Sequence, residues 1–169
     1  MTSKKIKILS EHKAYYSSPI GTIEIVASEL GITSLNFAKD SLAKSSSVHS
    51  CLKDVLVQVD EYFKGKRRKF SLKLILQGTD FQKKVWRELL KIPYGKTASY
   101  RDVAAAVGRE KAARAVGNAN RLNNIAIIIP CHRVIGSRGE LVGYGGGLWR
   151  KKWLLEHEHK FNADKNKRK

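Results

Sequence analysis

The chain has 169 residues, of which 42% are hydrophobic, so it can form one large or two small domains and is not a wholly disordered polypeptide. Its 33 Lys and Arg residues outnumber its 15 Asp and Glu residues, and the formal net charge of +18 favours a polyanionic partner, with nucleic acid as the first candidate. The excess is concentrated in the second half: residues 1–80 carry 13 basic and 8 acidic side chains, whereas residues 81–169 carry 20 and 7.

The two cysteines, Cys51 and Cys131, lie far apart in the sequence and form neither a disulfide framework nor a metal-binding motif. No apolar stretch reaches the length of a signal-peptide core or a membrane span. We therefore expect a cytoplasmic protein that keeps its thiols reduced, has no contact with membranes and binds no metal.

The first part of the chain predicts a small α+β unit over residues 1–77. Three β-rich runs separated by turn residues indicate an antiparallel meander, and they span residues 13–18, 22–27 and 31–37. From Val48 to Phe63, apolar residues recur at steps of three and four, which predicts a helix ended by Gly65. Cys51 lies on the apolar face of that helix, so we expect it to pack in the core.

A second domain is predicted over residues 78–159. Residues 70–77, with alternating leucines, form either another strand or the linker that leads to this domain. Thr79 and Ser99 each have an amide or acidic residue three positions later, which is the spacing of a capping box and predicts a helix starting at each point. The first of these helices ends before Pro93.

The second of these helices is broken by Gly108, and another helix, predicted over residues 110–121, follows after almost no connection. Helix, short turn, helix is the geometry of a DNA-binding helix-turn-helix. Small residues make the later helix slim enough to approach DNA closely, with Arg114 and Arg121 projecting from it; alternatively, they let it pack tightly inside the domain. The basic tail, residues 160–169, is expected to be solvated and disordered.

The segment Pro130-Cys131-His132-Arg133 follows the unbroken apolar run of residues 125–129, which predicts a core strand or extended segment. A neighbouring histidine and cation, here His132 and Arg133, can lower the pKa of a thiol toward neutrality, and the thiolate is the nucleophile. Cys131 is therefore a candidate nucleophile on a rigid edge. On these residues alone, a buried structural cysteine is the open alternative.

The chain resembles the O6-alkylguanine-DNA alkyltransferases through six motifs that occur in register over about residues 13–159. The motifs are Gly78-Thr79-x-Phe81-Gln82, Ile92-Pro93-Tyr94-Gly95, Ser99-Tyr100, Ala113-Arg114-Ala115-Val116-Gly117, Ile129-Pro130-Cys131-His132-Arg133-Val134, and Gly143-Tyr144-x-Gly146-Gly147 with Leu154-Leu155-x-x-Glu158. The resemblance implies an α+β (α/β) chain. Its N-terminal domain would be ribonuclease-H-like, with a three-stranded antiparallel sheet and a helix, and its C-terminal domain mainly helical, with a winged helix-turn-helix-like DNA-binding element.

The resemblance also implies a reaction, the irreversible and stoichiometric transfer of an alkyl group from O6 of guanine to Cys131, with O4-alkylthymine left open as a further substrate. It assigns protonation of the leaving group to Tyr100, removal of the thiol proton through a water to His132, and orientation of His132 to Glu158. Asn123 corresponds to a hinge asparagine that braces the turn carrying the cysteine. No cofactor is required, because the thioether product has no second leaving step.

The implied partner is double-stranded DNA containing O6-alkylguanine, bound by a monomer, with cooperative binding along DNA left open. The damaged base must leave the stack, at a cost on the order of a few kcal/mol, and Arg114 corresponds to the residue that fills the vacated space. The other DNA-binding residues implied are Ala113, Arg121, Ser99 and Arg133, and the substrate-pocket residues are Val134, Tyr144, Gly145 and Gly146. Gly145 stands where some members carry a serine, and the N-terminal zinc ligands of some members have no counterpart.

Two other classes of function stay open. An alkyltransferase-like protein would bind lesions without chemistry, although such relatives replace the nucleophilic cysteine and Cys131 is present. A Cys-His hydrolase would use the same pair of side chains but would need neither a helix-turn-helix nor a basic second half. The fate of Cys131 distinguishes the three classes: permanently alkylated, never modified, or acylated and released.

Overall fold

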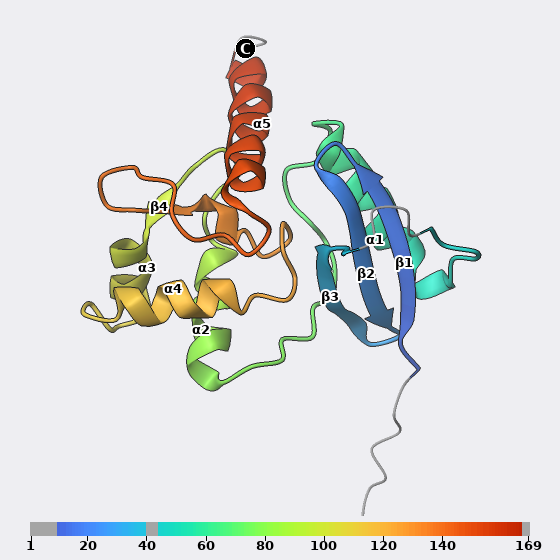
Figure 1. Cartoon of the computed structure of the whole chain (residues 1–169), viewed down its shortest axis with the longest axis horizontal. Coiled ribbons are helices and arrows are strands. Elements are labelled where there is room, and N and C mark those ends of the chain that lie inside the picture. Colours follow the sequence, from blue (N-terminus) through green and yellow to red (C-terminus); the bar gives the residue numbers. More distant parts are fainter. Residues whose placement is uncertain (1–9, 40–43, 167–169) are drawn as a thin grey trace, which may run out of the picture.

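The computed structural model describes residues 10–39 and 44–166. Strands β1 (His12–Ser18), β2 (Gly21–Ser28) and β3 (Gly31–Phe37) form one antiparallel sheet in the order β1-β2-β3 (Figure 1). The predicted meander is confirmed, because turn residues at both hairpins direct each strand back along its neighbour.

Helix α1 (Ser50–Phe63) lies against one face of this sheet (Figure 1). Its predicted apolar stripe is buried there, and the predicted stop is confirmed, because Gly65 follows the helix with a φ of 69°. The helix begins after His49, whose Nδ1 accepts a hydrogen bond from the backbone N–H of Cys51. Cys51 packs against the core but is only partly buried, so its predicted core position holds in part.

Residues 70–77, for which the sequence left a strand or a linker open, form an irregular connection with no regular strand. This connection makes one parallel bridge to β3, with two backbone hydrogen bonds to Ile32 of 2.9 and 2.8 Å. The same strand also bridges the second domain, since Leu35 N–H donates to Asn124 O and Ala126 N–H donates to Leu35 O, each at 2.8 Å. Strand β3 therefore anchors the start of the loop that leads to the predicted nucleophile.

In its described part, the second domain contains four α-helices, α2 (Asp80–Leu89), α3 (Tyr100–Ala106), α4 (Ala113–Arg121) and α5 (Leu148–Asn166). Both predicted capping boxes are present, with Thr79 and Ser99 as the N-cap residues. Helices α3 and α4 form the predicted helix-turn-helix. Helix α4 starts at Ala113 and not at residue 110, because Gly108, with a φ of 76°, and the turn after it occupy the intervening residues.

The apolar run of residues 125–129 is buried but does not form the predicted strand. It folds into tight turns, and Ile127 in its centre has a φ of 69°, a left-handed conformation that no extended segment contains. A single turn of 3-10 helix, η1 (Cys131–Arg133), follows. The chain then enters β5 (Val134–Ile135), which pairs in parallel with β4 (Ala98–Ser99), a contact between distant segments that the sequence did not indicate.

The prediction of a disordered tail from residue 160 is wrong for residues 160–166, which belong to helix α5. Helical structure continues to Asn166, and the ring of Phe161 lies against Gly65 while Arg68 donates a hydrogen bond to Phe161 O. These contacts hold the helix beyond the point where its sequence becomes polar, and residues 167–169 lie outside the described residues. Within the described ranges, no helix is both long and apolar enough to cross a membrane.

Candidate active site

Cys131 begins η1, and only 6% of its surface is exposed. Its Sγ accepts a 3.2 Å hydrogen bond from the side-chain amide of Asn123, which also donates to Ile129 O at 2.9 Å. The side-chain oxygen of Asn123 accepts a 2.9 Å hydrogen bond from Ile125 N–H. One amide therefore braces both ends of the turn that carries the thiol.

The turn before Cys131 is strained and rigid. Backbone in a sparsely populated region costs roughly 1–3 kcal/mol and persists only where the surrounding structure fixes it. Ile127, with a φ of 69°, is such a residue, and its side chain is fully packed in the core. Because Asn123 and β3 hold the two flanks of this turn, the thiol sits on a support with little freedom to move.

Behind the thiol, the buried carboxylate of Glu158 joins the two domains. Its hydrogen-bond donors are His132 Nε2 at 2.8 Å, Tyr62 Oη at 2.8 Å, Arg133 Nε and Nη2 at 2.8 and 2.9 Å, and Gly95 N at 3.0 Å. Glu158 comes from α5 and Tyr62 from α1, so one carboxylate links the N-terminal domain to the segment that carries Cys131.

Glu158 also determines which nitrogen of His132 carries the proton. An ionised carboxylate only accepts hydrogen bonds, which assigns the proton to Nε2 and leaves the lone pair on Nδ1. Burial lowers the pKa of His132, so the ring is neutral at pH 7. Burial alone would raise the pKa of Glu158, but the neighbouring His132 and Arg133 outweigh it and hold that pKa well below its usual value. Among the described residues, Nδ1 has no hydrogen-bond partner, so it can accept a proton.

These two shifts predict a loss of stability in acid. The pKa of His132 is lowered from 6.5 and that of Glu158 from 4.5, so the unfolded chain binds more protons than the folded one below each value. The free energy of unfolding is therefore expected to fall as the pH drops below 6.5, and to fall further below 4.5. Urea unfolding between about pH 7 and pH 4 measures this. A free energy of unfolding that stays constant between about pH 7 and pH 5 would contradict the conclusion that His132 is buried in its neutral form.

The structure contradicts the prediction that Arg133 binds DNA. It is 6% exposed, and its guanidinium is held by Glu158 and by a backbone carbonyl at 2.7 Å, so it is not available to phosphates. The cation that acts on Cys131 is Lys151, which sequence reasoning missed. Burial raises the pKa of the Cys131 thiol, and the hydrogen bond from Asn123 and the charge of Lys151 oppose that rise.

Lys151 is a fully buried lysine on α5. Its Nζ donates to Val142 O at 2.7 Å and lies 5.7 Å from the centre of the Tyr100 ring, whose hydroxyl donates to the same carbonyl at 3.0 Å. Burial lowers the pKa of Lys151 to about 8, so it keeps its charge at neutral pH. Burial, followed by the nearby Cys131, raises the pKa of Tyr100, so its hydroxyl keeps its proton. The position of Lys151 two helical turns before Glu158, on the same face of α5, is the signal that could have revealed it.

A cavity of about 320 Å³ lies beside Cys131, between β3, the end of α4 and the loop of residues 143–147. Tyr144, Gly145 and Gly146 line it, in the place that the sequence resemblance gives them. Val134 does not line this cavity, because it is fully buried in β5. A larger cavity of about 480 Å³, on the linker side of the second domain, contains no thiol, so we assign the site to the cavity at Cys131.

Arg150 links the loop of residues 143–147, beside this cavity, to the N-terminal domain. It is a second residue that the sequence analysis did not identify. Its guanidinium donates to Ile20 O and to Gly146 O, each at 2.7 Å, and lies 4.4 Å from the ring centres of both Phe37 and Trp149. A side chain at Gly146 would meet the Phe37 ring at 2.8 Å, so the close approach of loop and sheet requires glycine there.

Helix α4 has an inner face and an outer face. Its small residues were interpreted either as allowing close approach to DNA or as allowing tight packing inside the domain, and the two faces are compatible with both. Ala119 is fully buried against the domain, whereas Arg114 and Arg121 are exposed on the outer side. Ala113 occupies the first position of α4. Ser99 caps α3 through its hydroxyl, which accepts from a backbone N–H, so its side chain already has a structural role.

Comparison with known proteins identifies the family. The ribonuclease-like domain of 6-O-methylguanine DNA methyltransferase matches residues 12–76, and the DNA-binding domain of the same enzyme matches residues 80–160. The chain belongs to the 6-O-methylguanine DNA methyltransferase family. Family membership agrees with the observed order of a three-stranded sheet with a helix, followed by a helical domain with a helix-turn-helix.

Individual relatives of this methyltransferase family match over nearly their full length. The chain is 47% identical over 146 residues to the methylated-DNA–protein-cysteine methyltransferase of Methanosarcina barkeri, covering 83% of this chain and 92% of the relative. The crystal structure of Mycobacterium tuberculosis O6-methylguanine methyltransferase is 42% identical, with a TM-score of 0.81 over 89% of this chain and 94% of that one. A crystal structure of the M. tuberculosis protein in complex with DNA gives the same TM-score of 0.81, at 43% identity and the same two coverages.

Proposed function

We propose that this protein repairs O6-alkylguanine in DNA by moving the alkyl group onto its own Cys131. The observation that carries the proposal is a cavity beside a buried thiol that is backed by the His132 and Glu158 pair, in a family of methylated-DNA–protein-cysteine methyltransferases. The product is a thioether, which has no hydrolysable bond. Each molecule therefore acts once and needs no cofactor.

Cys131 and Asn123 at the cavity, with His132, Lys151 and Tyr100, supply the steps of this transfer. His132 Nδ1 takes the thiol proton through a water, while the charge of Lys151 and the amide of Asn123 favour the thiolate of Cys131. The sulfur attacks the alkyl carbon, and the bond from that carbon to O6 breaks with its electron pair on the guanine. The guanine takes up a proton from the hydroxyl of Tyr100, which its raised pKa keeps protonated until then.

Helix α4 is the part of the proposed DNA interface that enters a groove. Arg114 and Arg121 project from its outer face toward the phosphates or base edges, with Ala113 and Ser99 near the starts of α4 and α3. The damaged base must be flipped out of the stack to reach the cavity, and Arg114 takes its place. The M. tuberculosis structure in complex with DNA supports this use of the fold.

The structure favours chemistry over lesion binding without transfer, and over hydrolysis. A protein that only binds lesions needs neither a thiol braced by Asn123 nor the pairing of His132 with Glu158. A hydrolase must release its acyl group with a second nucleophile, whereas an S-alkyl product is stable. The test is the stoichiometry of repair: the amount of repaired guanine is expected to stop rising at one equivalent per active protein. Continued accumulation beyond that equivalence would overturn the proposal.

Arg114→Ala is expected to slow repair of duplex DNA and to spare transfer from free O6-benzylguanine. A free base needs no extrusion, so the flipping cost of roughly a few kcal/mol vanishes for it. Single-turnover rates on both substrates measure the difference, with Arg87→Ala on the exposed side of α2 as the matched control. If Arg114→Ala impaired both substrates equally, Arg114 would support the fold or the cavity and not base flipping.

Asn120→Leu is expected to reduce repair without lowering stability. Asn120 lines the cavity and is 7% exposed, and within the described chain neither its side-chain nitrogen nor its oxygen has a hydrogen-bond partner. We infer that this amide pairs with an edge of the flipped base, and loss of such a contact costs about 1–3 kcal/mol. The rate on O6-methylguanine duplex should therefore fall at least about fivefold, with the melting temperature unchanged or raised. An unchanged rate would remove Asn120 from the substrate site.

The proposal also covers where and in what form the protein works. We infer action as a monomer in the cytoplasm, on the DNA of the nucleoid, because the groups proposed for transfer all lie in one chain and both cysteines are free thiols. Whether the protein binds cooperatively along DNA is measured by titrating long and short duplexes. A higher affinity per site on the long duplex would show cooperativity.

A further inference from the structure

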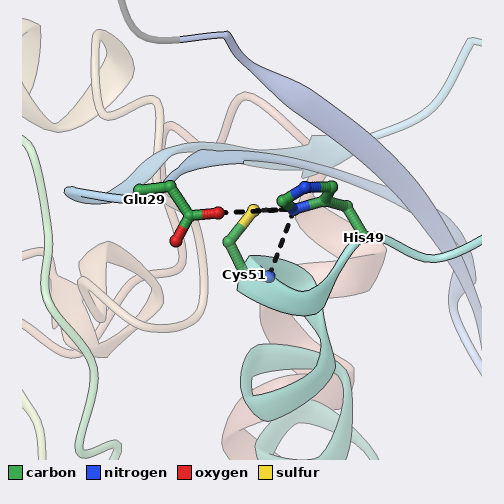
Figure 2. Close-up of side chains that lie close together, drawn as sticks. All are labelled: Glu29, His49 and Cys51. Carbon is green, nitrogen blue, oxygen red and sulfur yellow. Dashed lines mark hydrogen bonds and ion pairs between the residues drawn. The ribbon is translucent and has the colours of Figure 1, made fainter.

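A cluster of three potential metal ligands lies in the N-terminal domain, in elements that do not line the Cys131 cavity. Glu29 is in the turn between β2 and β3, His49 is the residue before α1, and Cys51 is in the first turn of α1 (Figure 2). Their ligand atoms all lie within 4.8 Å of one another. The three side chains point toward one another from two elements that are separated by about 20 residues of sequence.

Two of the three distances between these atoms are close to those of a tetrahedral zinc site, and the third, between Glu29 and Cys51, is at most 4.8 Å. His49 Nδ1 lies 3.2 Å from Cys51 Sγ and 3.6 Å from Glu29 Oε1. Zinc bonds of about 2.3 Å to sulfur and about 2.0 Å to nitrogen or oxygen place neighbouring tetrahedral ligand atoms roughly 3.3–3.5 Å apart. The His49–Cys51 and His49–Glu29 distances therefore need shifts of only a few tenths of an ångström, and the exposed Glu29 side chain can turn toward Cys51 Sγ to complete the set.

The ligands are also held in suitable chemical states. The ring of His49 stacks on that of His12, with centres 3.5 Å apart and planes within 5° of parallel, which fixes its orientation. Nδ1 accepts a long, 3.4 Å hydrogen bond from Cys51 N–H, so this nitrogen carries the lone pair, and a zinc–nitrogen bond would take the place of that hydrogen bond. Glu29 is exposed at the tip of a turn and can adjust its position.

We propose that Glu29, His49 and Cys51 bind one zinc ion, with a solvent molecule as the fourth ligand. A set of one sulfur, one nitrogen and one oxygen ligand suits zinc, which is borderline-soft and accepts all three. Binding replaces the S–H bond of Cys51 by a zinc–sulfur bond and releases one proton to solvent, with no oxidation or reduction. The ion would tie the β2–β3 turn to the start of α1 and so stabilise the N-terminal domain.

Burial and the negative charge of Glu29 raise the pKa of Cys51 in the metal-free protein. A bound cation reverses the influence of Glu29 and favours the thiolate directly.

Cobalt provides a direct probe, because a thiolate bound to Co²⁺ gives an intense charge-transfer absorption. The full chain carrying Cys131→Ser, which removes the competing thiol, is titrated with Co²⁺ and then with Zn²⁺. One equivalent of Co²⁺ is expected to produce the charge-transfer band, and one equivalent of Zn²⁺ to abolish it. Adding Cys51→Ser should eliminate the band.

Substitutions of the two other ligands test whether all three side chains bind the ion. His49→Ala should weaken zinc binding by more than the ~10–100-fold that follows loss of a residue that only supports a ligand. Glu29→Gln, a change on an exposed turn that leaves the fold intact, should weaken it at least about tenfold. The matched control is His159→Ala, an exposed histidine on α5, which should leave affinity unchanged. The proposed site would be wrong if Glu29→Gln and His49→Ala left zinc affinity unchanged. It would also be wrong if the Co²⁺ charge-transfer band persisted in Cys51→Ser. Neither result bears on the proposed alkyl transfer.

Discussion

Cys131→Ala is expected to abolish alkyl transfer and to leave affinity for DNA within about twofold of the parent. The sulfur is the proposed acceptor, and within the described residues the only other cysteine is Cys51, in the N-terminal domain. Most non-specific DNA affinity comes from Lys and Arg contacts to phosphate, which this substitution does not touch. Single-turnover repair assays measure the first effect, and titration of an undamaged duplex at fixed salt measures the second.

The matched control for this prediction is Cys51→Ala, which removes the other thiol and should retain full transfer in one turnover. Two results would contradict the assignment. Residual transfer in Cys131→Ala would place the acceptor elsewhere, and a large loss of DNA affinity together with a lower melting temperature would make Cys131 a structural residue.

Glu158→Gln is expected to cost both stability and activity. The carboxylate accepts hydrogen bonds from His132, Arg133, Tyr62 and Gly95, and a glutamine would turn an NH₂ group toward at least one of these donors. Breaking a buried ion pair by removing one partner typically costs about 3–5 kcal/mol, because the remaining charge is left unpaired. The transfer rate should fall as well, because His132 loses the acceptor that orients its ring.

Glu156→Gln is the matched control for Glu158→Gln, since it makes the same chemical change two residues away on the exposed side of α5. Glu156 forms a 3.8 Å ion pair with Lys152 on the surface, and such a contact contributes little to stability, so little change is expected. Urea unfolding and single-turnover rates on both variants separate the two positions. Equal, small effects at Glu158 and Glu156 would show that the buried network contributes neither to folding nor to transfer.

Local sequence patterns were enough to predict most of the secondary structure. The meander, α1 with its stop at Gly65, and the capping boxes at Thr79 and Ser99 all depend on residues within four positions of one another. The family resemblance pointed to Cys131, Asn123 and the loop of residues 143–147, and the structure places all three beside one cavity.

The misplaced or missed residues depend on contacts between distant segments. The family resemblance implied that Arg133 contacts DNA, but Glu158, 25 residues later, forms an ion pair with it inside the domain. Lys151 lies on α5, and no local sequence pattern specifies the packing that buries it. The run 125–129 was expected to be extended because it is apolar, yet Ile127 adopts a left-handed turn that Asn123 and β3 impose.

The same limit applies to the three proposed metal ligands. His49 and Cys51 are two residues apart, but Glu29 joins them only because the β2–β3 turn meets the start of α1. The expectation that the protein uses no metal rested on the lack of a sequence motif, and a site assembled from two elements carries no such motif.

The intact mass of the protein after reaction with duplex DNA containing O6-methylguanine tests the central claim most directly. With the lesion in excess, each molecule is expected to gain the mass of one methyl group, and proteolytic mapping should place that group on the peptide that contains Cys131. The modified protein should then be inactive on fresh duplex, because the thioether cannot be released. An unmodified mass despite bound lesion, a modification on another residue, or repair that continues with unmodified protein would contradict alkyl transfer to Cys131.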